Sequence, residues 1–334
     1  MEAHIATTSG ERPLAGRSPL ARLPDQALRY GLTALSLAVL ALLAFFFVRL
    51  YVESNPAFSK FGLDFVFGNN WDVANNVFEA LPLVVGTLIT SALALLIGVP
   101  IAVATAVFLV EICPGRLKTP LTIMVDLLAA VPSVVYGLWG FYFLIPKLRP
   151  VEQWFTDTFS FIPFIGGAGT IAGPNYFIAG LVLAIMILPI VSAISREVLT
   201  TVPPDHKEAA LALGMTRWEM IKTAMLPYAR RGIVGGSMLG LGRAIGETIA
   251  VTIVIGDAPV IGNNIFDQGY TLASVIANEF GEAASQPLHR AALIGAGLVL
   301  FVLTFVVNAI ARLIVSRSER KGKVMLTETA ELGA

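Results

Sequence analysis

Six long stretches of this chain carry almost no charged side chains, and they limit the fold more than any other feature. The stretches run from Arg29 to Arg49, Ala80 to Val110, Pro120 to Ile145, Tyr176 to Ser195, Gly232 to Gly256 and Ala291 to Ala311. A helix of roughly 20 apolar residues crosses a bilayer core about 30 Å thick, and each stretch reaches that length. Because helices satisfy their own backbone hydrogen bonds in lipid, the pattern predicts an all-α polytopic membrane protein with six transmembrane helices.

The composition excludes several other classes of protein. Of 334 residues, 56% are hydrophobic and 14% charged, whereas soluble domains have about 45 to 50% apolar and roughly 25% charged residues. The 23 basic and 23 acidic residues balance, so no basic field indicates nucleic acid as a partner. A single cysteine and three scattered histidines argue against a disulfide within the chain and against a metal cluster. We therefore expect a membrane protein without a metal site.

The distribution of basic residues predicts the orientation in the membrane. Seventeen of the 23 lysines and arginines fall in the two tails and in the connections after the second and fourth spans. Since cytoplasmic connections are enriched in basic residues, both termini should be cytoplasmic. The polar lead before the first span is too long for a secretory signal, so we interpret that span as retained. The predicted organisation is a tail over 1–28, a six-span domain over 29–315 and a tail over 316–334.

The predicted outer connection from Pro146 to Asn175 is rich in phenylalanine and then in glycine. This composition suits docking of an external partner. An interfacial aromatic segment followed by a flexible turn explains the same composition and is the favoured of the two interpretations, which both stay open.

The cytoplasmic loop over 196–231 predicts two short capped helices rather than a plain solvated connection. Asp205 is placed to cap the first helix, and Gly214 suits the left-handed position that ends it. Thr216 is placed to cap the second helix, which Leu226 and Pro227 should close. One face of these helices is apolar and has no domain to cover it, which indicates a partner or a membrane surface. Its members are Ala209, Ala210, Leu213, Met215 and Trp218.

The same loop carries a motif that belongs to a known family. The motif is a Glu-Ala-Ala run, then a glycine, then a terminal Leu-Pro pair: Glu208, Ala209, Ala210, Gly214, Leu226 and Pro227. It resembles the EAA signature of bacterial ABC importer permeases, and this resemblance implies that these residues couple the chain to a groove of an ATP-binding subunit. Ala224 departs from the family pattern, which favours isoleucine there, so one packing contact should be smaller.

The fifth span contains two charges within a glycine-dense run, Arg243 and Glu247. A charged side chain at the centre of a membrane helix costs about 2.5 to 3.5 kcal/mol on insertion scales, so both should face protein or water. Four residues apart on a helix, they share a face and can pair. The pair could be purely structural, among glycines that serve close helix packing. Alternatively, the planar guanidinium of Arg243 holds an oxyanion through two N–H donors, and Glu247 pairs with Arg243 when the site is empty.

Asp126 in the third span is open to two interpretations. It lies near the predicted cytoplasmic end of that span. A carboxylate there either rests at the membrane interface or takes part in function, and the two are equally well supported.

Three further segments narrow the family. They cover residues 80–88, 131–140 and 241–248, and they resemble the PstC-type permeases of bacterial phosphate importers. The resemblance extends over about residues 60 to 315 and departs at Glu79, where the family has glycine. It implies a type I ABC importer permease in the bacterial inner membrane that takes up inorganic phosphate. The implied partners are a homologous second permease, two ATP-binding subunits at the cytoplasmic loop and an external phosphate-binding protein.

Two classes of function remain: the permease subunit of an ATP-driven importer, or a self-contained anion channel or proton-coupled carrier that uses Arg243 and Glu247. The chain has no phosphate-binding loop, because Gly322 and Lys323 are followed by Val324, so ATP and Mg would be bound by a partner and this chain needs no cofactor. A carrier typically has interrupted helices, of which we find no sign in the sequence. A membrane enzyme would need a cluster of nucleophile and base, which is also missing. The two-helix loop favours the importer.

Overall fold

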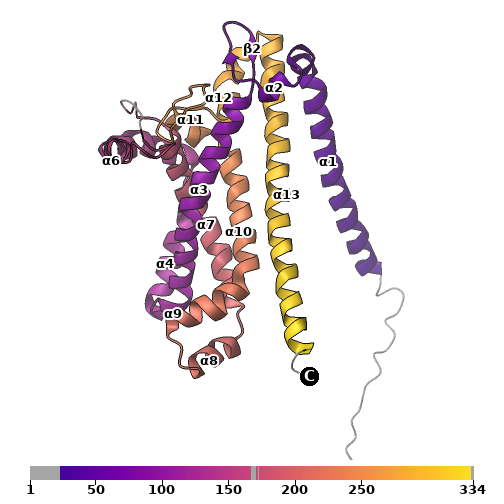
Figure 1. The fold of residues 1–334 in the computed structure, drawn as a ribbon. Helices are drawn as coiled ribbons and strands as arrows, with labels where there is room; N and C mark the ends of the chain where they lie inside the picture. Colours follow the sequence, from indigo (N-terminus) through magenta and orange to yellow (C-terminus); the bar gives the residue numbers. More distant parts are fainter. Residues whose placement is uncertain (1–22, 167–170, 172, 332–334) are drawn as a thin grey trace, which may run out of the picture. The chain divides into compact units, whose positions relative to one another are not determined.

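The computed structural model describes residues 23–166, 171 and 173–331, and most of this part is helical (Figure 1). It divides into two units, Met1–Val52 and Glu53–Ala334. Most of the predicted N-terminal tail, with Arg12, Arg17 and Arg22, lies outside the described residues, as does part of the glycine-rich outer connection.

The first unit contains, in its described part, the beginning of α1 (Leu23–Phe61). This helix is apolar on all sides over the first predicted span, which is typical of a helix in lipid. It continues past the predicted end at Arg49 into the second unit.

After the end of α1, the second unit has a short helix and a two-stranded hairpin before its other long helices. The hairpin pairs β1 (Trp71–Asp72) with β2 (Val77–Phe78) in antiparallel register, Trp71 opposite Phe78. The helices up to the outer connection are α2 (Asp64–Phe67), α3 (Leu81–Val107), the π-helix η2 (Phe108–Ile112), α4 (Gly115–Leu128), α5 (Ser133–Trp139), the π-helix η3 (Gly140–Leu144) and α6 (Ile145–Thr158). The remaining helices are α7 (Tyr176–Thr200), α8 (Pro204–Ala212), α9 (Arg217–Met220), the π-helix η4 (Ile221–Met225), α10 (Leu226–Gly246), α11 (Ile249–Ile255), α12 (Leu272–Ala283) and α13 (Pro287–Glu331).

The helical polytopic fold is confirmed, although two of the six spans are broken. Four helices in the described residues are long and apolar enough to cross a membrane on their own: α1, α3 with η2, α7 and α13. The other two predicted spans correspond to bent pairs, one of 88° between α4 and the α5–α6 segment and one of 64° between α10 and α11. The expectation that interrupted helices are lacking is therefore wrong.

The break in the third span has a clear cause in the sequence. Pro132 stands immediately before α5 with an extended backbone (ψ 141°), and α4 ends at Leu128. Proline has no N–H to donate and disfavours helical geometry in the residue before it, so a continuous helix from Pro120 to Ile145 is not possible here. After the bend, α6 exposes large aromatic side chains such as Trp154 and Phe155.

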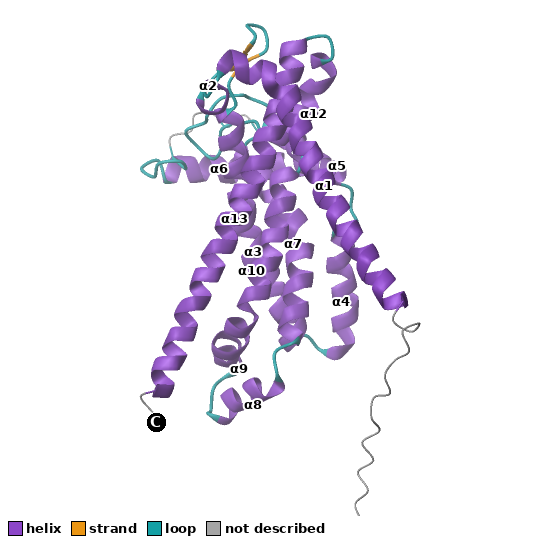
Figure 2. Ribbon diagram, turned by 90° about the vertical axis from the view of Figure 1, so that its right-hand side faces the viewer, coloured by secondary structure: helices purple, strands orange, loops and turns teal. Residues whose placement is uncertain are grey.

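Helix α7 is the most deeply buried element of the second unit and organises its core. It packs along α3 and α10 and against α11, and both views show α3, α7 and α10 side by side (Figures 1 and 2). The core around it includes Tyr176, Leu183 and Ile187 from α7 and Val254 from α11, all almost fully buried.

The two ends of α3 lie in different apolar clusters. One cluster joins the hairpin to α12 and the start of α13 through residues such as Trp71, Phe78 and Leu272. The other joins the end of α3 to α7, α8, η4 and α10. Helices α8 and α9 therefore lie at the end of the bundle opposite the hairpin (Figure 2), where the sequence places the cytoplasm.

Candidate functional site

The predicted two-helix loop is present as α8 and α9. Thr216 caps α9 through a capping box, in which the Glu219 N–H donates to Thr216 Oγ1 (3.3 Å) and the Thr216 N–H donates to Glu219 Oε2 (2.8 Å). Asp205 does not cap α8: the helix begins at Pro204, with Pro203 at its N-cap, and Asp205 falls in the first turn. The fixed φ of a proline is pre-organised for the first helical position, which explains the earlier start.

Gly214 ends α8 in the left-handed conformation, as predicted, with φ +80°. The Met215 N–H donates to Ala210 O (3.3 Å) and the Gly214 N–H to Leu211 O (3.0 Å), which is the Schellman arrangement. A β-carbon at Gly214 would meet no atom within 4 Å, so the requirement for glycine here comes from the backbone and not from crowding.

The apolar face of the loop divides between the bundle and the surface. Ala210 is buried and packs with Met215 in the cluster at the end of α3. Leu213 and Trp218 remain 79% and 58% exposed, and Leu211 is also exposed. We call these three side chains, Leu211, Leu213 and Trp218, the docking patch. Such an uncovered group of large apolar side chains is typical of a surface that binds a partner.

Leu226 and Pro227 do not close the second helix, contrary to the prediction. The chain passes from α9 through η4 into α10 without leaving helical geometry. Proline lacks an N–H and crowds the carbonyl four residues earlier, and the wider π turn of η4 lies just where that conflict would arise. The loop is thus continuous with the fifth span.

The glycines of α10 lie on two different faces. Gly232, Gly236 and Gly240 face α7, where an added β-carbon would come within about 3 Å of Val198, Ile194 and Val191 respectively. This face serves close packing. A second set has only open space around it: Gly235, Gly242 and Gly246. Among the residues that the structure describes, none covers this second face.

Arg243 and Glu247 do not share a helical face as predicted. Helix α10 ends at Gly246, Glu247 adopts an extended backbone (ψ 132°), and α11 leaves at an angle of 64°. Among the described residues neither side chain forms an ion pair. Glycine-rich helices bend readily at such points, and this bend separates the two charges. The internal salt bridge expected from the sequence is absent in this part of the chain.

Arg243 occupies the uncovered side of α10. Its side chain is exposed, as is that of Leu239 one turn earlier. Its charge lies close enough to the phenol of Tyr136 on α5 to interact electrostatically with it. The Tyr136 hydroxyl itself donates to Leu128 O at the break of the third span (2.7 Å). The two broken spans therefore come together near Arg243.

The structure also contains two ion pairs between helices that sequence reasoning missed. Lys207 on α8 pairs with Glu111 on η2, and Arg196 on α7 pairs with Asp126 on α4. The partners are 96 and 70 residues apart, so no local pattern reveals them. Of these four residues, Glu111 is marked in the sequence, because its charge comes directly after a long apolar run.

Comparisons with known proteins identify a matching family and similar proteins. The family model described as binding-protein-dependent transport system inner membrane component matches residues 98–320. A protein of Pasteurella multocida (strain Pm70) named phosphate transport system permease protein PstC is 44% identical over 288 residues, 85% of this chain and 89% of that protein. Its namesake in Mesorhizobium japonicum is 42% identical over 90% of this chain and 92% of that protein. The fold is similar to that of a chain of a bacterial alginate ABC transporter, with a TM-score of 0.59 and 18% identity. The match covers 89% of this chain and 98% of that chain.

Proposed function

The chain belongs to the family of binding-protein-dependent transport system inner membrane components, and from this premise we propose that it is the permease subunit of an ATP-driven importer of inorganic phosphate. As a member of this family it lies in the inner membrane. The observation that carries the proposal is the 44% identity to a phosphate transport permease over 85% of the chain.

Coupling to ATP hydrolysis is assigned to the cytoplasmic loop. Permeases of ABC importers work with ATPase and binding-protein partners, and this chain offers the docking patch for the ATPase. Glu208, Ala209 and Gly214 lie beside the patch on the exposed surface of the loop. The Ala210 side chain and the Leu226–Pro227 pair lie on the bundle side or at its edge, and we propose that they hold the loop in place.

The phosphate path is assigned to the uncovered face of α10. A homologous second permease would cover this face and complete the path, giving a heterodimer. Arg243 would then contact phosphate, because a guanidinium offers a permanent charge and a planar fork of donors that matches an oxyanion. We propose that Glu247, at the bend, is the countercharge that pairs with Arg243 in another conformation, when the bend straightens and the site is empty.

A self-contained anion channel or proton-coupled carrier is the second candidate, and the two broken spans support it, because transporters often bind ions at interrupted helices. Such a protein would have no use for the docking patch. The same breaks also serve an importer, where they allow two halves of a span to move separately.

Uptake of labelled phosphate into proteoliposomes tests the proposal. The complete complex of the chain, its second permease, the ATPase pair and the phosphate-binding protein should accumulate phosphate only when ATP and Mg are supplied on the ATPase side. Uptake by this chain alone, driven by a proton gradient, would support the carrier and contradict the importer. Sulfate as competitor checks the substrate.

A further inference from the structure

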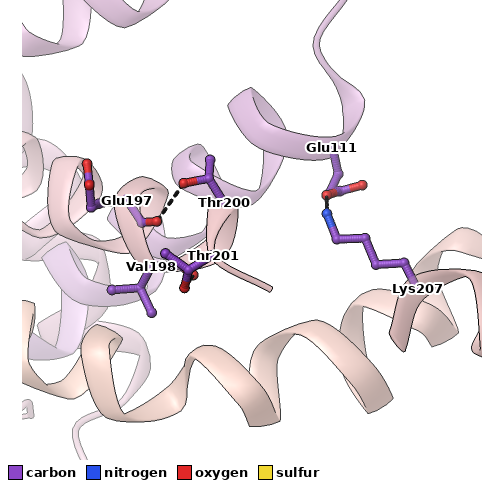
Figure 3. Close-up of polar contacts among 6 residues, drawn as sticks. All are labelled: Glu111, Glu197, Val198, Thr200, Thr201 and Lys207. Carbon is purple, nitrogen blue, oxygen red and sulfur yellow. Dashed lines mark hydrogen bonds and ion pairs between the residues drawn. The ribbon is translucent and has the colours of Figure 1, made fainter. Parts of the chain in front are cut away.

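One ion pair ties the first helix of the cytoplasmic loop to a membrane span. The Lys207 Nζ on α8 donates to Glu111 Oε1 on η2, and Figure 3 shows the two side chains reaching toward each other from separate helices. Their side chains are 23% and 18% exposed, so the pair is largely withdrawn from water. A partly buried charged hydrogen bond is directional and stronger than an exposed one.

Glu111 lies on a π turn that ends the span of α3. In η2 the Cys113 N–H donates to Phe108 O, five residues back (2.8 Å). A π turn adds one residue to the helix, which rotates every later side chain by about 100° relative to an α-helix. The irregular turn therefore sets the direction in which Glu111 leaves the span.

The connection before α8 is short and its ends are fixed. Helix α7 ends at Thr200, and two threonine hydroxyls satisfy carbonyls of its last turn: Thr200 Oγ1 donates to Glu197 O (2.6 Å) and Thr201 Oγ1 to Val198 O (2.8 Å) (Figure 3). Val202 is buried. Helix α8 is thus joined covalently to α7 and by Lys207 to the end of α3.

The apolar cluster beneath the loop does not provide the same link. Ala210, Met220 and Ile221 contact several helices at once through small or flexible apolar groups. Apolar contact is not directional, so it does not tie one point of α8 to one point of the α3 span. An ion pair at a fixed point transmits a push or a pull along one line.

We infer that Lys207 and Glu111 are positioning residues that transmit displacement of α8 to the α3 span, so that movement of a docked ATPase is converted into movement of the transport path. This inference rests on the proposed function. It assigns the loop two separate tasks: the docking patch binds the ATPase, and the ion pair passes the movement on.

The test uses the complete complex in proteoliposomes and measures phosphate taken up per ATP hydrolysed. We expect Lys207→Gln and Glu111→Gln to lower this ratio about tenfold, the change that corresponds to about 1.4 kcal/mol. The amount of ATPase that co-purifies should stay normal, because the docking patch is intact. Lys118→Gln, which changes an exposed lysine at the same end of the bundle, should leave the ratio unchanged.

The charge-exchanged double variant Lys207→Glu with Glu111→Lys separates transmission from simple damage. Restoration of the uptake ratio by the exchange supports the inference. If Lys207→Gln inserts poorly, Lys207→Arg takes its place: because it keeps the charge, a normal uptake ratio in this variant supports the inference. A normal ratio in both glutamine variants overturns it, and so does an exchanged pair that inserts and binds ATPase but stays uncoupled. Absence of ATP-driven phosphate uptake by the unaltered complex would instead overturn the proposed function.

Discussion

Arg196 on α7 donates through Nη2 to Asp126 Oδ1 on α4 at 2.6 Å. The Arg196 side chain is 15% exposed and that of Asp126 is 48% exposed, so the arginine is the buried partner. Neither interpretation that the sequence left open for Asp126, a place at the membrane interface or a part in function, included this bond between two helices at the end of the broken span.

Asp126→Asn should lower the free energy of unfolding by about 1 kcal/mol, because the half-exposed carboxylate is partly screened by solvent while Arg196 loses its countercharge. Thermal unfolding in detergent measures the change. A double-mutant cycle with Arg196→Gln should give a non-additive loss, since the two residues are in contact. Additive losses would mean that the ion pair contributes nothing to stability.

The overall architecture could be predicted because its signals are local. Runs of apolar residues between charges locate the spans, and the four-residue pattern from Thr216 to Glu219 locates a helix start. The left-handed turn at Gly214 is of the same kind, because its geometry depends on one residue type. Each of these features is decided by residues that are neighbours in the sequence.

The rest of the site depends on tertiary structure. A helical spacing of four residues predicts that Arg243 and Glu247 meet, but the bend after Gly246 cancels that spacing. Pro132 marks the break in the third span, but no pattern of apolar residues marks the bend after Gly246. The pairing of Lys207 with Glu111 arises only when two distant segments pack together.

Asp257 should make stability depend on pH outside the spans. Burial, reinforced by the charge of Glu279, raises the pKa of this carboxyl to about 6, and its Oδ1 is buried without a hydrogen-bond partner. A raised pKa stabilises the folded state at low pH, so this contribution is fully present below about 4 and is lost as the pH rises through about 6. Asp257→Asn should therefore melt at a higher temperature than the unaltered protein at pH 8, with the difference fading toward pH 4. Asparagine also tolerates the positive φ of 52° at this position.

Asp72 provides a control of opposite sign. Hydrogen bonds from Asn75 lower the pKa of this exposed carboxyl on β1, so its contribution is present above the ordinary pKa and is lost as the pH falls. Asp72→Asn should melt lower at neutral pH and approach the unaltered protein in acid. Parallel pH profiles for the two variants would contradict the assignment for Asp257.

The docking patch should bind the ATPase through its two most exposed members. Leu213→Asp and Trp218→Ala should each reduce co-purified ATPase by at least tenfold, since a central aromatic or aliphatic anchor contributes about 2 kcal/mol or more. Both side chains are exposed, so the amount of protein in the membrane should not change. The control is Lys118→Gln, which lies outside the patch and should retain ATPase. An exposed leucine in a span, such as Leu96, is unsuitable as a control because a charge there would disturb insertion into the membrane.

Gly214→Asp should also leave the protein in the membrane while lowering ATPase binding, because it places a charge beside the patch, at a φ of +80° that aspartate and asparagine adopt more readily than most residues. Gly214→Asn is the matched comparison: asparagine tolerates left-handed geometry and adds no charge. We expect the asparagine variant to keep most of its ATPase. Normal ATPase recovery with Gly214→Asp would argue against the loop as the docking element.

Arg243→Ala should lower phosphate uptake at least about a hundredfold without preventing assembly of the complex. The side chain is exposed and forms no ion pair in the described part of the chain, so its removal leaves no buried partner behind. Glu247→Gln should have a milder effect, because it removes only the proposed countercharge of the empty site. Uptake per inserted protein, measured in the complete complex, gives both values.

The uncharged double variant Arg243→Met with Glu247→Leu decides between a transport role and a packing role for these residues. An oxyanion that crosses apolar surroundings needs a compensating charge, and this variant supplies none while keeping similar side-chain volume. We therefore expect it to insert normally and to remain inactive, like Arg243→Ala. If the charges only held helices together in another conformation, replacing both by apolar groups would remove the cost of burying them and transport would return. Restored uptake in the double variant would thus exclude Arg243 from the phosphate path, and the open glycine face of α10 would then serve contact with the second permease alone.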